Sequence, residues 1–205
     1  MPLGNEQHFL CMDSIPKLIE ACLRRERRAE KALYEIHYGF LMSLCVRYTS
    51  DREEARELVN AIFVKVFLSL GTFDPARPFI PWLKKIAIRT AIDELRKKSR
   101  LPSFMRLEDN LVETEDSGSE EESGVARYAS NLSHDELLGM LKQLPPPLCT
   151  VFNLYAIDEI PHEQIAVLLD ISTRTSKRHL HNARQFLREA ILQRVAQKEA
   201  GYGTK

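Results

Sequence analysis

Basic side chains gather in the segment Phe79–Arg100, although the chain of 205 residues has 29 lysines and arginines against 29 acids. At helical spacing one side of the segment is apolar and contains the single tryptophan, Trp82, which we expect in the core. The remaining surface carries cations that could track phosphate groups: Lys84, Lys85, Arg89, Arg96 and Lys97. The alternative is a solvated helix end whose last cations interact with the helix dipole.

A second group of cations follows a predicted turn near the C-terminus. Asp170 and Ile171 separate two short helical patterns, and Ser172 is suited to be the N-cap of the second. That second helix presents side chains that could read base edges or contact phosphate in a major groove: Arg174, Thr175, Lys177, Arg178, His181 and Arg184. Turn, cap and charge together favour a helix-turn-helix over a generic helical hairpin.

Catalytic chemistry finds little support in the sequence. The neighbouring acid–base pairs Glu53/Glu54 and His162/Glu163 both stand at predicted helix starts, where capping explains them. Spaced metal ligands, a nucleophile motif and a glycine-rich phosphate loop are all missing from the sequence. We therefore predict no enzyme, no catalytic residue, no metal, no cofactor and no small-molecule substrate. Four scattered cysteines are expected to be reduced and mostly buried.

The elements that hold these residues are predicted to be helices. Glycine is scarce, with 8 residues, and apolar residues recur every three or four positions, which favours an all-α fold. Residues 50–53 have the form of a capping box, and Gly71 is expected to end the helix that follows. Helices are predicted over residues 15–23, 27–48, 51–70, 79–100 and 134–144. A further helix is predicted to run through residue 155, and two more are predicted to begin at residues 161 and 173.

Charge patterning divides the chain into two parts. Residues 107–124 contain many acids and neither lysine nor arginine, so they cannot bury enough apolar surface to order themselves. We predict two small helical domains, 14–100 and 131–198, joined by a flexible acidic linker over 101–130. The second domain is the helix-turn-helix.

The predicted helix over residues 51–70 has a second, weaker apolar set beside its main stripe. Ala61, Val64 and Leu68 lie next to a polar line formed by Arg56, Glu57 and Asn60. The set either widens the core stripe or forms a docking surface for another protein.

The N-terminal part resembles the first conserved domain of bacterial sigma factors of the extracytoplasmic-function group. The resemblance rests on LYEIHYGFLMSLCVRYTSDREEARELVNAIFVKVF, FDPARPFIPWLKKIA and AIDELRKKSR. It implies that the loop Thr72–Pro78 holds an extruded base and that the five cations named above bind the minus-ten element. Arg89 replaces a usual asparagine, which makes the promoter preference harder to transfer. The resemblance also implies a polymerase-binding set: Arg56, Glu57, Leu58, Asn60 and Ala61.

Residues 144–187 are similar to the fourth region of sigma factors, which binds the minus-thirty-five element. Three positions depart from the family: Gln164, Ser176 and Asp170, where glycine is usual in the turn. Aspartate tolerates a left-handed backbone better than most residues do. The resemblance assigns minus-thirty-five binding to the six side chains of the second group.

Together the two resemblances imply an alternative sigma factor that binds core RNA polymerase and promoter DNA, aids strand opening and is held inactive by an anti-sigma protein. No secretory signal or bilayer-length apolar run is apparent, so we expect a cytoplasmic protein without membrane insertion. The alternative is a helical interaction protein, or a helix-turn-helix regulator that does not bind the polymerase core.

Overall fold

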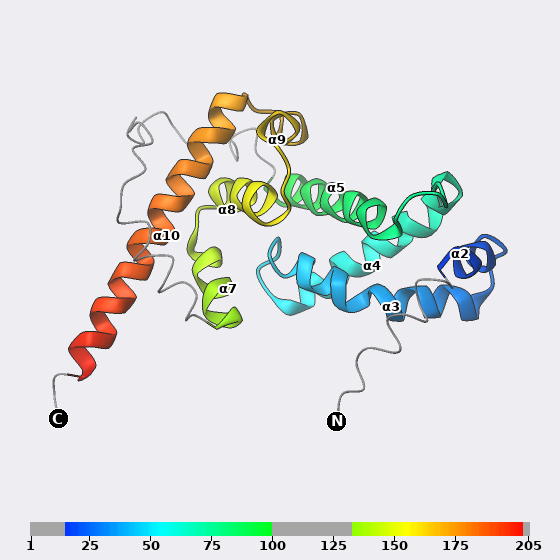
Figure 1. Cartoon of the computed structure of the whole chain (residues 1–205), viewed down its shortest axis with the longest axis horizontal. Coiled ribbons are helices and arrows are strands. Elements are labelled where there is room, and N and C mark those ends of the chain that lie inside the picture. The colour runs from blue at the N-terminus through cyan, green and yellow to red at the C-terminus, as the bar shows by residue number, and fades with distance from the viewer. Residues whose placement is uncertain (1–14, 100–132, 203–205) are drawn as a thin grey trace. The chain divides into compact units, whose positions relative to one another are not determined.

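The computed structural model describes residues 15–99 and 133–202, and the predicted linker, 101–130, lies outside them. All described elements are helical and no strand occurs among them, so the predicted all-α class is confirmed (Figure 1). The chain divides into two compact units, residues 1–98 and 99–205, which are described separately below. Within the described residues, no helix has the length and apolar character needed to cross a membrane.

The described part of the N-terminal unit contains four α-helices and a short 3₁₀ turn: α2 (Ile15–Leu23), α3 (Arg27–Cys45), α4 (Arg52–Ser69), η1 (Leu70–Thr72) and α5 (Phe79–Ser99). The α-helix α3 ends three residues before the predicted boundary, because Arg47 and Tyr48 donate to carbonyls only three residues back. α4 ends at Ser69 and tightens into η1, in which Gly71 has no positive φ. Gly71 therefore does not end the helix in the left-handed conformation expected of a terminal glycine.

The start of α4 is capped one residue later than the sequence pattern suggests. The Asp51 carboxylate accepts a hydrogen bond from the backbone N–H of Glu54 at 2.8 Å. The Glu54 carboxylate in turn accepts from the backbone N–H of Ser50 at 3.1 Å. Both oxygens satisfy donors that a helix start leaves without intrahelical partners, so α4 has a firm beginning.

Helices α3, α4 and α5 build the core of the N-terminal unit. The most deeply buried side chains include Leu33 and Leu41 of α3, Ile62 and Val66 of α4, and Leu83 of α5. Cys22 and Cys45 are buried free thiols, and burial raises their pKa to about 11 and about 12. They therefore behave as small apolar residues, as expected.

The C-terminal unit contains α7 (His134–Gln143), α8 (Pro146–Phe152), the π-helical turn η3 (Asn153–Ile157), α9 (His162–Leu169) and α10 (Thr173–Tyr202). A capping box between Ser133 and Glu136 starts α7. Pro146 and Pro147 occupy the first turn of α8, where a missing N–H costs nothing. The helices pack through a cluster around Leu144, Leu148 and Ala183, which fixes α10 against α8.

Candidate nucleic-acid and polymerase interfaces

The cations of α5 are placed opposite its packed side. Lys85, Arg89 and Arg96 are exposed and lie on one side of the helix at spacings of four and seven. Leu83, Ala87 and Ala91 are buried on the other side. The sequence-predicted set is thus brought onto one helix, with Lys84 half-buried and Lys97 exposed.

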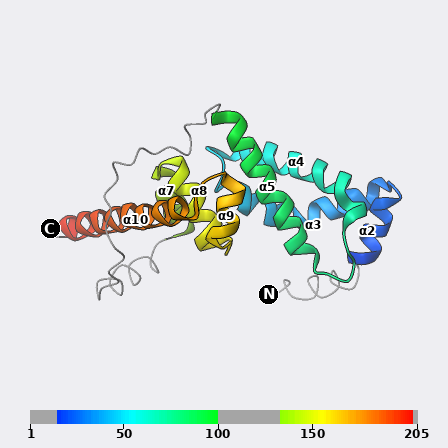
Figure 2. The same ribbon diagram turned by 90° about the horizontal axis from the view of Figure 1, so that it is seen from above.

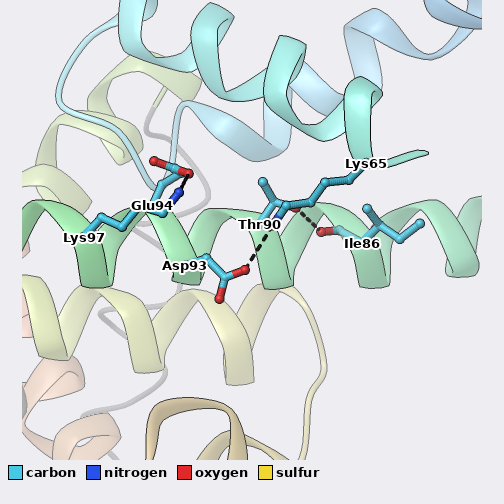
Figure 3. Close-up of polar contacts among 6 residues, drawn as sticks. All are labelled: Lys65, Ile86, Thr90, Asp93, Glu94 and Lys97. Atoms are coloured by element: carbon cyan, nitrogen blue, oxygen red, sulfur yellow. Dashed lines mark hydrogen bonds and ion pairs between the residues drawn. The ribbon is translucent and has the colours of Figure 1, made fainter. Parts of the chain in front are cut away.

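Two acids on α5 are engaged by lysines of the same unit, as Figure 3 shows. Asp93 pairs with Lys65 of α4 at 3.0 Å, and Glu94 pairs with Lys97 at 2.6 Å. The hydrogen bond to Glu94 raises the pKa of Lys97. Because Lys97 is exposed, exchanging this partner for a phosphate costs little.

An aromatic cluster anchors the start of α5. The ring centroid of Phe73 lies 5.3 Å from those of both Phe79 and Trp82. Phe79 is buried, whereas Phe73 and Trp82 are half-buried, so Trp82 packs at the edge of the core. The loop between Phe73 and Phe79 is ordered by Asp74, which accepts a hydrogen bond from the Ala76 N–H at 3.0 Å and pairs with Arg77 at 3.3 Å.

The proposed polymerase-binding set of α4 is divided by burial. Arg56, Glu57 and Asn60 are exposed, and Ala61 is half-buried. Leu58 is only 5% exposed and belongs to the core. The Asn60 side chain accepts a hydrogen bond from the Tyr34 hydroxyl of α3 at 3.0 Å, which holds its orientation.

The weaker apolar set of α4 lies on the surface. Val64 is 59% exposed and Leu68 is 74% exposed, so they do not widen the core stripe. With Glu57 and Ala61 they form a row at helical spacing, and we call these four residues the α4 surface. An exposed apolar row beside polar residues is typical of a docking surface.

A cavity of about 200 Å³ borders the α4 surface. Its lining includes Glu54, Glu57, Glu94 and Lys98, and Lys98 pairs with Glu54 at 2.9 Å. The hydrogen bond from Lys98 lowers the pKa of Glu54. Within the described part of the chain, no group of acids, histidines and cysteines is arranged to hold a metal.

The turn between α9 and α10 has the geometry that the sequence predicts. Asp170 adopts the left-handed conformation, with φ 56° and ψ 49°. The Ser172 hydroxyl oxygen accepts a hydrogen bond from the backbone N–H of Thr175 at 2.9 Å and so caps α10. The two predictions for this turn are confirmed.

The second group of cations lies on one side of α10. Arg174, Lys177 and Arg184 are exposed, and Arg178 and His181 are half-buried. The opposite side of the helix packs through Ser176, His179, Leu180 and Ala183. Thr175 is tied to Ser172 by a hydroxyl–hydroxyl contact of 2.8 Å, so it fixes the turn.

In the C-terminal unit the structure buries two histidines for which the sequence pattern gives no signal. His162 stacks on Tyr155 with ring centroids 4.3 Å apart, and its Nδ1 lies 2.8 Å from the Ser176 hydroxyl. His179 is fully buried, and burial lowers its pKa to about 4. The hydroxyl of Ser176, a residue that departs from the family pattern, therefore has a hydrogen-bond partner in His162 on the preceding helix.

Two family models match the chain. The family described as Sigma-70 region 2 matches residues 33–101, which include most of α3 and all of α4 and α5. The family described as Sigma-70, region 4 matches residues 134–187, which include α9, the turn and the cationic part of α10.

Two curated relatives align along almost their whole length. The ECF RNA polymerase sigma factor SigW of Bacillus subtilis is 27% identical over 187 residues, covering 86% of this chain and 96% of SigW. The RNA polymerase sigma-H factor of Pseudomonas aeruginosa is 26% identical over 191 residues, covering 89% and 96%. Among solved structures, CnrH in complex with the cytosolic domain of CnrY has 21% identity and a TM-score of 0.45, covering 86% of this chain and 95% of that one.

The family models cover the helices that carry both groups of cations, and the aligned relatives extend over the residues between them. The chain therefore belongs to the extracytoplasmic-function group of the sigma-70 family and is a sigma factor that directs promoter-specific transcription.

Proposed function

We propose that the two units of this sigma factor divide promoter recognition between them. Residues 14–100 bind core RNA polymerase and the minus-ten element, and residues 131–198 bind the minus-thirty-five element. One observation carries the proposal: in each unit, cations occupy the solvent side of a helix whose opposite side is packed into the core. Family membership supplies the partners, core RNA polymerase and promoter DNA.

In the C-terminal unit, the first turns of α10 enter the major groove. The rigid cap at Ser172 and the left-handed turn at Asp170 fix the angle between α9 and α10. Arg174 and Arg178 then reach guanine edges or phosphates, and Lys177 and Arg184 contact the flanking backbone.

In the N-terminal unit, α5 holds the separated strand. Lys84, Lys85, Arg89, Arg96 and Lys97 supply the cations that track its phosphates. The loop Thr72–Pro78 receives an extruded base, and its internal hydrogen bonds at Asp74 keep it preformed. A preformed loop loses less entropy when the base enters.

The α4 surface, with Arg56 and Asn60 beside it, docks on core RNA polymerase. Its exposed apolar row and oriented amide support this role. The sigma factor binds core RNA polymerase in the cytoplasm, where the polymerase is found. An anti-sigma protein that covers the α4 surface and the cations of α10 would keep the factor inactive.

Run-off transcription with purified core RNA polymerase and a library of genomic fragments tests the proposal. We expect transcripts from a small set of fragments and none from core enzyme alone. Binding to DNA without polymerase should be weak. A protein that binds specific DNA alone but never starts transcripts with core enzyme would contradict the proposal.

A further inference from the structure

Four arginines surround the junction between α2 and α3, outside every surface described so far. Residues 24–31 read RRERRAEK and hold five cations against Glu26 and Glu30. We call Arg24, Arg25, Arg27 and Arg28 the arginine corner. All four are exposed.

Stability does not explain the arginine corner. Only Arg24 has an ion-pair partner within the described residues, Glu26 at 2.8 Å, and both side chains are more than half exposed. Arg27 and Arg28 begin α3, where the helix dipole is already positive and favours acids instead. Arg25 has a φ of 61°, in the left-handed region that arginine disfavours. The concentrated positive charge is therefore suited to a polyanionic ligand.

The end of α2, which directly precedes the arginine corner in the sequence, packs against η1, the turn before the loop that leads into α5. The side chain of Leu23, the last residue of α2, reaches Gly71, since a Cβ on that glycine would lie 3.9 Å from Leu23 Cδ2. α2 also contacts η1 directly. Figure 2 shows the connection from α4 to α5 passing beside α2. The loop itself carries the exposed Arg77.

We propose that the arginine corner binds phosphates of the promoter strand where this strand continues past the base held by the loop Thr72–Pro78. The proposal rests on the role of α5 and of this loop given under Proposed function. Guanidinium groups bind phosphate through two parallel hydrogen bonds and stay charged at any working pH. The contact of α2 with η1, which leads into the loop that carries Arg77, favours a DNA strand over an acidic protein.

The test compares three forms of the full chain bound to core RNA polymerase. The first is unsubstituted, the second carries Arg25→Ala, Arg27→Ala and Arg28→Ala, and the third carries Arg→Lys at the same positions. Affinity for a fluorescent fork DNA with an unpaired minus-ten strand is measured between 50 and 200 mM salt. Each lost single-strand phosphate contact lowers the salt slope by about 0.7. The slope of the alanine form should therefore be smaller by about 2. The rise from 50 to 200 mM salt should then reduce the DNA affinity of the alanine form about 16-fold less than that of the unsubstituted form. The lysine form should keep most of the slope.

Shortened DNAs locate the contact. Two fork DNAs are prepared. In one the unpaired strand ends at the upstream edge of the minus-ten element, and in the other it ends at the downstream edge. On one of them the unsubstituted and alanine forms should bind equally, because the phosphates in question are gone. A difference that persists on both shortened DNAs would overturn the proposal.

Two further results would also overturn the inference. An unchanged salt slope with normal run-off transcription would leave the proposed function intact and remove the arginine corner from DNA binding. Loss of core polymerase binding by the alanine form, with its circular dichroism unchanged, would make the corner a protein contact instead.

Discussion

The Nδ1 atom of His162 lies 2.8 Å from the hydroxyl oxygen of Ser176, and this contact joins the two helices of the helix-turn-helix. Both residues are buried, and Tyr155 covers the imidazole by stacking on it. Hydrogen bonds depend on direction, which apolar contacts do not, so this buried contact restricts how α9 and α10 can be oriented. It thereby helps to hold the angle at which α10 meets DNA.

Ser176→Ala should destabilise the C-terminal unit. The substitution leaves the buried Nδ1 of His162 without a partner, which costs about 1–3 kcal/mol. Hydrogen exchange of the α9 and α10 amides in the full chain measures the change as faster opening. Ser43→Ala is the control, because its hydroxyl is exposed and donates only to the Phe40 carbonyl of its own helix, and it should change little. Equal protection in Ser176→Ala and the unsubstituted chain would show that the contact adds no stability.

The C-terminal unit should lose stability as the pH falls from 6.5 towards 4. Burial, and to a smaller extent the charge of Arg178, lowers the pKa of His179 from 6.5 to about 4. The pKa of His162 is also lowered, first by burial and then by Lys177, with Arg184 acting in the same direction and Glu163 opposing them. The folded unit therefore keeps both rings neutral, whereas the unfolded chain binds protons below pH 6.5. Stability is complete above pH 6.5 and falls below it, for His179 by about 3 kcal/mol in total.

The pH dependence is measured by hydrogen exchange of α10 amides at several pH values, corrected for the intrinsic exchange rate. His179→Leu should flatten the profile, because it removes the group that titrates. His37→Leu is the control, since His37 is a buried histidine of the other unit with a lowered pKa. A steep profile that survives in His179→Leu would contradict the assignment.

Local signals were readable from the sequence, and contacts between distant residues were not. Asp170 and Ser172 form a turn and a cap from neighbouring residues, so their spacing alone predicts the geometry. His162 and Ser176 are 14 positions apart and meet only because the turn folds α9 against α10. The sequence pattern therefore shows Ser176 as a departure and gives no sign of its partner.

Helical periodicity likewise divides core from surface less sharply than the fold does. Leu58 stands beside Glu57 and Asn60 in the motif that suggests polymerase binding, yet it is buried. Val64 and Leu68 belong to a stripe that could equally have been core, and they are exposed. The direction in which neighbouring helices approach α4 decides these cases, and that direction is a tertiary property.

Arg178→Glu should impair recognition of the minus-thirty-five element while sparing polymerase binding. The substitution places a carboxylate against phosphate or base acceptors on the DNA-facing side of α10, where repulsion and a lost contact add. We expect at least a tenfold loss of promoter affinity, corresponding to about 1.4 kcal/mol or more. Footprinting of the polymerase complex measures this, and co-purification measures core binding. Gln193→Glu, which introduces the same carboxylate at an exposed position farther along α10, is the control. Loss of core binding by Arg178→Glu would contradict the assignment of α10.

Lys85→Ala with Arg89→Ala should slow strand opening and leave closed complexes. These two cations lie next to each other on the solvent side of α5, and neither has an ion-pair partner among the described residues. Removing them takes away about two phosphate contacts that exist only when the strand is separated, so opening suffers more than initial binding. Permanganate reactivity of thymines in the minus-ten region, followed over time, measures opening. The control Lys31→Ala removes an exposed cation of α3 that pairs with Glu35, and it should open at the normal rate. Because both substitutions leave the packed side of α5 untouched, normal opening in the double variant would remove this side of α5 from strand capture and move that task to the loop before it.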